Sequence, residues 1–478
     1  MLFISIFTLG LSWVIFQPPF ASVDEPAHAS RAYTAVHGQL IFPINTNTAA
    51  DAVDEITVPN WILPYAEPDS PYCFWSRIEI TADCAKTDWS KDEPTKRPNQ
   101  FAQYFPTFYF IAGLPSIWFH GQLAYYLMRF FGMLTVMVFF YMILREIRIN
   151  ISPKLIGLSL IAITPMNFLG AATLAPLALE TLSITLLTIL LFRISNSGFM
   201  GKADQYKFYV VLFTSLTARP SGIVWNVIVW SYFLLTRQLD IRNINKTNLG
   251  KNFTRVSLII FIFASVNLYL HRPKVAYNLG TYKITIFNNL SFGVQSASEQ
   301  FNNMIGIFGM DVYIPHIFYY ISFGILSFFV YTNIFSKNIT KIQKTFLALV
   351  SLLLLTLHMF ADYFYKDIFA HIWIGRYTTP LLAFIIAICI LNLRNELNIW
   401  IFAAYGIGIN LLALWISYFR YSIGFTGGNC CGVLRRLENG FKWYPLGQGI
   451  GTLAALSTVI VTCAFGSYLL QKSLNESK

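Results

Sequence analysis

Charged side chains are scarce in this sequence, and their scarcity limits the class of fold. They make up 12% of the 478 residues, whereas hydrophobic residues make up 55%. An ordinary soluble domain has roughly 25% charged residues. So few charges cannot build the polar shell of a water-soluble protein of this length. The composition therefore excludes a soluble fold and indicates an integral membrane protein.

The sequence also lacks the cysteine, histidine and glycine motifs of several common chemistries. Its six cysteines and seven histidines show no zinc-ligand spacing. It has no glycine-rich phosphate loop and no Gly-x-Ser-x-Gly nucleophile elbow. The net charge of +11 does not form a basic stripe with interleaved aromatic residues, so nucleic acid is not an expected partner. Cys73 and Cys84 share one polar loop and could form a disulfide in an oxidising compartment, although spacing alone does not prove the bond.

Long apolar runs dominate the sequence that is present. They are continuous rather than alternating, and a helix that crosses the hydrocarbon core needs about 20 such residues. The interval 104–120 has prolines near its ends and is interpreted as a re-entrant or interfacial segment. We therefore predict an all-α integral membrane fold of about 12 transmembrane helices, at roughly 1–16, 123–144, 155–170, 176–193, 207–218, 220–236, 256–270, 314–335, 345–361, 379–393, 398–419 and 449–470.

The distribution of charge predicts which loops face the cytoplasm. Residues 18–103 hold 12 of the 23 acidic residues but 6 of the 34 basic ones, so this long first loop is expected to be extracytoplasmic. Both termini are then cytoplasmic. The other extracytoplasmic loops are expected at 271–313, 362–378 and 420–448, whereas Lys and Arg collect in the expected cytoplasmic loops at 145–154, 237–255 and 337–344.

One cluster of polar residues follows the first predicted helix. Pro26 suits the first turn of a second helix, with Asp24 near its N-cap. Asp24 and His28 are four residues apart and share a helical face, and Arg31 follows one turn later. Either Asp24 or Glu25 could be a general base that the neighbouring cations orient. The alternative is a capped interfacial helix whose charges pair with one another.

A second cluster lies where an extracytoplasmic loop is expected to enter a helix. Arg376 and Tyr377 occupy this boundary, where an arginine suits a lipid phosphate or diphosphate because of its rigid fork of donors. Both residues could instead be interfacial anchors that snorkel to the headgroups. Arg219 lies between two short apolar runs and suggests either a water-filled cavity or an interfacial turn.

Further candidate residues lie in the later extracytoplasmic loops. Asp311 could neutralise a cation or hold a sugar hydroxyl, and His316 follows it at the start of a predicted helix; a simple turn and helix start fits both equally well. Arg435 and Arg436 form a basic patch that could meet an anionic polysaccharide or a lipid phosphate, or could be solvated. Tryptophans of the first loop could stack on glycan rings or pack within the loop: Trp61, Trp75 and Trp89.

Four short segments, in this order along the chain, resemble a bacterial family of polytopic membrane proteins. That family belongs to the GT-C superfamily of glycosyltransferases that use polyprenyl-phosphate sugars. The segments begin at the diproline before Asp24, at Tyr104-Phe-Pro, at Phe308-Gly-Met-Asp and at Gly375-Arg-Tyr. The resemblance covers nearly the whole chain. It implies a GT-C-like module over 1–393 and additional membrane helices over 394–478.

The resemblance also implies an activity and a place for it. The expected reaction is inverting transfer of a sugar from a polyprenyl-phosphate donor to a surface glycan, on the extracytoplasmic face of the bacterial inner membrane. Asp24 would be the base with Glu25 as its substitute, and Arg376, Tyr377 and Arg219 would bind the donor phosphate. His28 and Arg31 would support them, and substrate contacts would come from Asp311, His316, Arg435 and Arg436.

The sequence departs from the family pattern at one point that bears on metal dependence. The family commonly has an acid in its short second external loop, but residues 164–176 contain none and the next acid is Glu180. A site with one carboxylate holds a divalent ion poorly, so a metal is doubtful and no other cofactor is expected. An enzyme that adds glucose to lipopolysaccharide O-antigen is one specific hypothesis. The alternatives are a polysaccharide polymerase or ligase that uses diphosphate-linked glycans, and a transporter or flippase for lipid-linked sugars.

Overall fold

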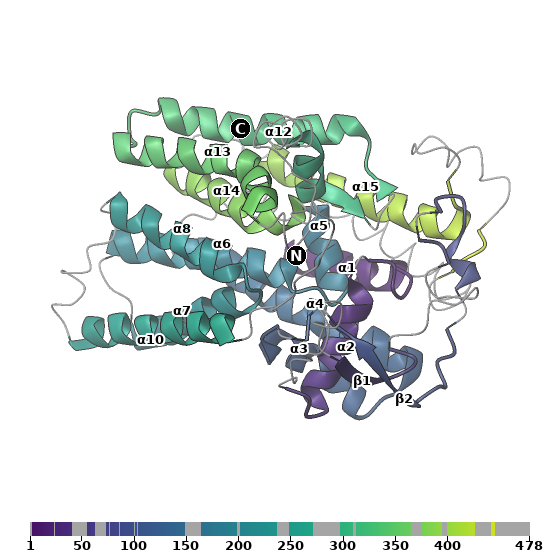
Figure 1. The fold of residues 1–478 in the computed structure, drawn as a ribbon. Helices are drawn as coiled ribbons and strands as arrows, with labels where there is room; N and C mark the ends of the chain where they lie inside the picture. Colours follow the sequence, from purple (N-terminus) through teal and green to yellow (C-terminus); the bar gives the residue numbers. More distant parts are fainter. Residues whose placement is uncertain are drawn as a thin grey trace.

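The protein is predominantly helical (Figure 1). The computed structural model describes residues 2–22, 24–40, 55–62, 73–75, 77–85, 87–99, 101–102, 104–148, 164–197, 201–236, 248–270, 297–308, 312–364, 375–393, 399–425 and 441–444. Predicted features that fall on 271–296, on Asp311 or on the segment with Arg435 and Arg436 lie outside these residues.

Among the described residues, five helices are long and apolar enough to cross a membrane. They are α4 (Gly121–Glu146), α6 (Leu177–Ser197), α12 (His316–Phe335), α13 (Lys341–Phe364) and α14 (Thr379–Leu393), the last counted with the 3₁₀ turn before it. A helical membrane protein is therefore confirmed. The count of about 12 crossings stays a prediction, because 151–163 and 445–478 lie outside the described residues.

The helix α6 is the centre of the bundle. Within its candidate span 94% of the residues are buried, against 22% for α12, so α12 presents most of its apolar surface outward. The other helices of the bundle are α1 (Leu2–Phe16), α5 (Pro165–Ala172), α7 (Lys202–Thr217), α8 (Gly222–Leu235), α10 (Asn248–Leu270) and α15 (Ile399–Ile423). Figure 1 shows α12, α13 and α14 as one group, α6 and α8 beneath them, and α7 and α10 beyond.

A small layer covers one end of this bundle. It contains α2 (Glu25–Val36), α3 (Pro106–Gly113) and the antiparallel pair β1 (Glu55–Pro59) and β2 (Pro94–Pro98), which lie together in Figure 1. Counted with the following 3₁₀ turn Leu114–Ile117, α3 is too short to cross a bilayer, as expected for a re-entrant or interfacial segment. Glycine is needed at 113, because a Cβ there would lie 2.0 Å from the Ala32 carbonyl oxygen.

The loop that carries Cys73 and Cys84 is fastened to α15 near this layer. The two cysteines form a disulfide, which confirms the pairing that the sequence left open. The buried guanidinium of Arg420 donates hydrogen bonds to three backbone carbonyls of the same loop: Phe74 O at 2.8 Å, Arg77 O at 3.0 Å and Ile80 O at 2.7 Å. A further strand pair, β3 (Ile307–Phe308) and β4 (Val312–Tyr313), lies beside α5 and α15.

Ionic clusters mark the two ends of α6. Near its end, Arg193 donates to Glu146 of α4 at 3.0 Å, and Glu146 also pairs with Lys207 of α7. Near its start, Glu180 pairs with Arg219, which lies in the turn between α7 and α8. The turn at Arg219 therefore lies at the opposite end of α6 from Glu146, the last residue of α4.

Candidate active site

A buried ion pair fixes the turn that leads into α2. Arg129 of α4 donates two hydrogen bonds to the carboxylate of Glu25, from Nε to Oε1 at 2.6 Å and from Nη2 to Oε2 at 2.8 Å. Neither side chain is exposed. Arg129 also donates to the carbonyls of Gln17 at 2.7 Å and Pro18 at 2.8 Å. The carboxylate of Glu25 is thus used to hold the chain between α1 and α2. The prediction that Glu25 could substitute for Asp24 does not fit this position.

Asp24 precedes α2 in a left-handed backbone conformation, with φ of 69°. It is the N-cap residue, as expected, but its side chain makes no capping hydrogen bond. Instead, Oδ2 of Asp24 accepts a hydrogen bond of 2.8 Å from Nη2 of Arg376. The residue predicted as the base and a residue predicted to bind the donor phosphate are therefore in direct contact.

The position of Arg376 depends on the glycine before it. A Cβ at Gly375 would lie 1.8 Å from the backbone oxygen of Gln300, so only glycine lets this segment touch the helical residues 297–306. The chain then makes a 3₁₀ turn at Gly375–Thr378 and enters α14. This close backbone approach aims Arg376 toward α2 rather than along α14.

Two guanidinium groups lie against one aromatic ring at this site. The Cζ of Arg219 is 4.5 Å from the centroid of the Tyr377 ring, and that of Arg376 is 5.4 Å from it. Nη1 of Arg219 is 3.3 Å from Oε2 of Glu180, whose Oε1 accepts a 2.6 Å hydrogen bond from Ser221. Arg219 is therefore a buried cation that faces this site, and Glu180 is its polar partner within the bundle.

His28 lies one turn along α2 from Asp24. Its ring stacks on Phe101 at 4.1 Å between centroids, and its Nδ1 lies 2.8 Å from the Tyr109 hydroxyl, within hydrogen-bond distance. Burial holds the pKa of His28 well below its usual value, and the positive charges of Arg219 and Arg376 lower it further. His28 is therefore neutral at physiological pH and can donate or accept a hydrogen bond without adding charge.

Five of the predicted site residues line a single cavity, which we call the Asp24 cavity. These are Asp24, His28, Arg219, Arg376 and Tyr377. The rest of its wall comes from the segment between α5 and α6 and from Ser22, Phe101, Met166 and Gly170. Its volume is about 30 Å³, which accommodates one or two water molecules. A larger ligand must therefore enter by displacing one of the side chains that now fill the site.

Strained backbone is concentrated around the Asp24 cavity. Among the described residues, three non-glycine residues have left-handed φ values, namely Phe20, Asp24 and Leu174. Asp24 lines the cavity and Leu174 immediately precedes its wall residues Ala175 and Pro176. Such conformations cost on the order of 1–3 kcal/mol each and cluster at functional sites.

The other predicted site residues lie elsewhere or outside the described chain. Arg31 is buried and donates to the backbone oxygens of Tyr104 and Gln39, so it ties α2 to the segment before α3. His316 is exposed at the start of α12, where its ring lies 6.1 Å from that of Tyr319, and it is not part of the Asp24 cavity wall. Asp311, Arg435 and Arg436 are not among the described residues.

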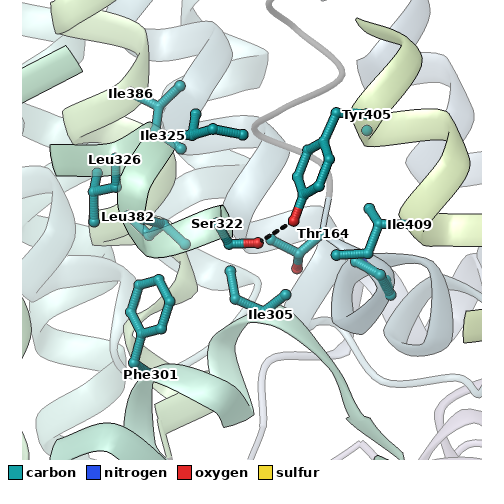
Figure 2. Close-up of a pocket in the computed structure, with 12 residues that line it drawn as sticks. Thr164, Phe301, Ile305, Ser322, Ile325, Leu326, Leu382, Ile386, Tyr405 and Ile409 are labelled. Carbon is teal, nitrogen blue, oxygen red and sulfur yellow. Dashed lines mark hydrogen bonds between the residues drawn. The ribbon is translucent and has the colours of Figure 1, made fainter. Parts of the chain in front are cut away.

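A separate cavity between α12, α14 and α15 has a different character (Figure 2). Its walls are mainly aliphatic, and its polar feature is a hydrogen bond of 2.7 Å between the hydroxyls of Ser322 and Tyr405. None of its lining residues carries a charge. It lacks the acid and base groups of the Asp24 cavity and is not a candidate for the chemistry.

No group of three metal-ligating side chains gathers in the described part of the chain. Asp24 in the cavity wall, and Glu180, which contacts the wall residue Arg219, are each paired with an arginine. Arginine cannot give up its proton in a protein, so a cation would have to displace it from the carboxylate. The site as built favours an anion more than a metal ion.

These features together define a helical membrane protein with an arginine-lined polar cavity at one end of its bundle. The chain belongs to the family of predicted membrane proteins DUF2142, whose model matches residues 7–385. No curated protein and no solved structure matches the chain.

Sequence reasoning missed Arg129, although one signal for it was present. Arg129 is a charged residue within an apolar run, and such residues are costly unless they pair inside the bundle. Its partner could not be chosen from sequence, because Glu25 is 104 residues away. Tyr104 and Tyr109 were noted as part of a motif, but their contacts with Arg31 and His28 appear only in the structure.

Proposed function

We propose that this protein is a membrane glycosyltransferase of the GT-C type that transfers a sugar from a polyprenyl-phosphate donor. The observation that carries the proposal is the contact between Asp24 and Arg376 in a cavity that also contains Arg219. One carboxylate next to two guanidinium groups supplies a base for the acceptor and a binding site for an anionic leaving group. Family membership alone names no activity, so the site carries the argument.

The reaction follows from the positions of these charges. A donor phosphate that reaches Arg376 competes with Asp24 for the same guanidinium, because both are anions that accept its hydrogen bonds. Binding of the phosphate thereby releases the Asp24 carboxylate from its partner. Asp24 can then remove the proton of an acceptor hydroxyl.

The bond changes balance without a cofactor. The acceptor oxygen forms a bond to the anomeric carbon from the face opposite the phosphate, and the bond between that carbon and the phosphate oxygen breaks. The phosphate leaves with the electron pair, stabilised by Arg376 and Arg219. Asp24 holds the proton, and the configuration at the anomeric carbon is inverted. Tyr377 keeps the two guanidinium groups apart and oriented.

The side of the membrane is proposed from the disulfide and the charge distribution. Disulfides form and persist in oxidising compartments, and Cys73–Cys84 lies in the acidic first loop. This loop shares its end of the bundle with α2 and Asp24. We therefore propose an active site on the extracytoplasmic face of a bacterial inner membrane, with both termini cytoplasmic. The proposed acceptor is a surface glycan such as lipopolysaccharide O-antigen.

The direct test of the proposed reaction is release of lipid phosphate. Purified protein is incubated with a panel of polyprenyl-phosphate sugars and, separately, with diphosphate-linked oligosaccharides. The lipid products are then separated and identified by mass spectrometry. The proposal expects polyprenyl phosphate from at least one monophosphate donor and none from an Asp24→Asn variant. Turnover of diphosphate-linked donors alone would instead indicate a polymerase or ligase.

A further inference from the structure

A second and larger cavity lies on the other side of the turn that leads to Asp24. Its volume is about 440 Å³, within the roughly 300–1,000 Å³ that is usual for small-molecule sites. We call it the aromatic cavity. It is lined by Pro18, Pro19, Ala82, Ala85, Thr87, Trp89, Gln122, Tyr126, Trp443 and Tyr444.

The chemistry of this wall limits what can bind there. Four aromatic rings supply flat apolar faces, and Gln122 and Thr87 supply neutral hydrogen-bonding groups. None of the described lining residues carries a charge. A phosphate or a carboxylate would find no cation among them. Sugar rings have both apolar C–H faces that stack on aromatic rings and hydroxyls that bind amides and hydroxyls, so an uncharged glycan fits this wall.

The aromatic side chains are held in place before any ligand binds. The Trp89 ring stacks on Phe20 with an interplanar angle of 11° and meets Tyr125 edge-on at 5.8 Å. Gly121 has φ of 61°, and a Cβ there would lie 2.6 Å from the Trp89 carbonyl oxygen, so this glycine allows Trp89 its position. Such pre-positioning lowers the entropy lost on binding.

The opposite wall is fixed by a separate part of the chain. The backbone N–H of Trp443 donates to the Ser422 carbonyl at 3.4 Å, and its ring lies 6.4 Å from that of Tyr418. The disulfide Cys73–Cys84 constrains the segment that carries Ala82 and Ala85. Thus the first loop and the segment after α15 converge on one cavity, although they are far apart in sequence.

We propose that the aromatic cavity binds an uncharged segment of a glycan and, given the transferase function proposed above, that this glycan is the acceptor. The chain itself connects the two sites. Pro19 lines the aromatic cavity and Ser22 lines the Asp24 cavity, so their Cα atoms lie at most about 11 Å apart. A glycan seated on Trp89 can therefore extend past the diproline turn toward Asp24.

The experiment measures glycan binding without a donor, so that it does not depend on transfer. Purified protein in lipid nanodiscs is applied to an array of bacterial surface oligosaccharides, both neutral and acidic. We expect binding to neutral members, weakened at least about tenfold by Trp89→Ala and by Trp443→Ala. Trp118→Ala, which removes an exposed tryptophan that does not line the cavity, is the matched control and is expected to bind normally.

Two further variants separate the possible outcomes. Gln122→Ala alters an exposed lining residue, and it is expected to weaken binding of the same glycans if Trp89→Ala fails to fold. Arg376→Ala is expected to bind the glycan as wild type does but to lose transfer. Glycan binding and transfer are therefore measured separately, and a failure of the transferase proposal would leave the glycan-binding result unchanged. Absence of neutral-glycan binding, or equal binding by wild type and the three cavity variants Trp89→Ala, Trp443→Ala and Gln122→Ala, would overturn the inference.

Discussion

Arg376 and Asp24 are 352 positions apart in the sequence, yet Nη2 of Arg376 lies 2.8 Å from Oδ2 of Asp24. The side chains are 12% and 20% exposed respectively, so the pair is shielded from bulk water but not sealed. Asp24 holds this pair from a left-handed backbone conformation, and such conformations cluster at functional sites.

Asp24→Asn is expected to abolish transfer and leave the fold intact. Asparagine has the same shape and tolerates left-handed φ, but it cannot accept a proton. Loss of the base should lower the transfer rate by about 100-fold to 10,000-fold. Asp88→Asn, at an exposed acid of the same loop, is the control and should transfer at the wild-type rate. Near-normal transfer by Asp24→Asn, measured on monodisperse protein, would remove Asp24 as the base.

Breaking the pair between Glu25 and Arg129 is expected to damage folding rather than catalysis. Glu25→Gln leaves a buried guanidinium without its counter-charge, which costs about 3–5 kcal/mol. The variant should show a clearly lower temperature of thermal unfolding in detergent. The double variant Glu25→Gln with Arg129→Met should lose less than the sum of the two single changes, because no orphaned charge remains. If Glu25→Gln has wild-type stability but has lost transfer, Glu25 is a catalytic residue and not only a structural one.

Removal of the disulfide is expected to loosen the loop that borders the aromatic cavity. In the chain-entropy model, a bridge between cysteines 11 positions apart stabilises the folded state by about 2–3 kcal/mol. The Cys73→Ser and Cys84→Ser double variant should lose this stability. In membranes isolated without reductant, Cys73 and Cys84 should resist maleimide until they are reduced. Mass spectrometry of the labelled peptides measures this. Rapid labelling of both thiols in native membranes would contradict an oxidising, extracytoplasmic location for the loop.

The stability of the protein is expected to fall as the solution becomes acidic, partly because of His28. Its pKa is lowered in the folded state by burial and by two arginines, so below about pH 6.5 the unfolded chain binds the proton more readily. Each pH unit in that window removes up to about 1.4 kcal/mol. Thermal unfolding at pH 7.5 and 5.5 should show a larger drop for wild type than for His28→Gln. An equal drop in both would show that His28 is not the group responsible.

How much of this could be predicted from the sequence differs between the fold and the site. Continuous apolar runs predicted the helices α4, α12 and α14, because a span needs about 20 apolar residues whatever its neighbours are. The short α3 was anticipated from prolines near its ends. Packing order was not predictable, since the spans of α4 and α6 have mean hydropathies of 2.0 and 1.9 but are 50% and 94% buried.

The site was partly predictable because its residues stand at helix boundaries. Asp24 lies just before α2 and Arg376 just before α14, where polar residues are expected to gather. The pairing of Glu25 with Arg129, and the use of Gly375 to approach Gln300, depend on contacts between distant segments. Adjacent carboxylates look alike in sequence, and only the packing of α4 separates the role of Glu25 from that of Asp24.

Binding of polyprenyl phosphate to purified wild type and Arg376→Ala tests the central claim most directly, because it needs neither the sugar nor the acceptor to be known. Native mass spectrometry in detergent measures the affinity, with Arg255→Ala, at an exposed arginine of α10 outside the Asp24 cavity, as the control. We predict saturable binding to wild type and to the control, and at least about tenfold weaker binding to Arg376→Ala. Equal affinity of wild type and Arg376→Ala for the lipid phosphate would contradict the account.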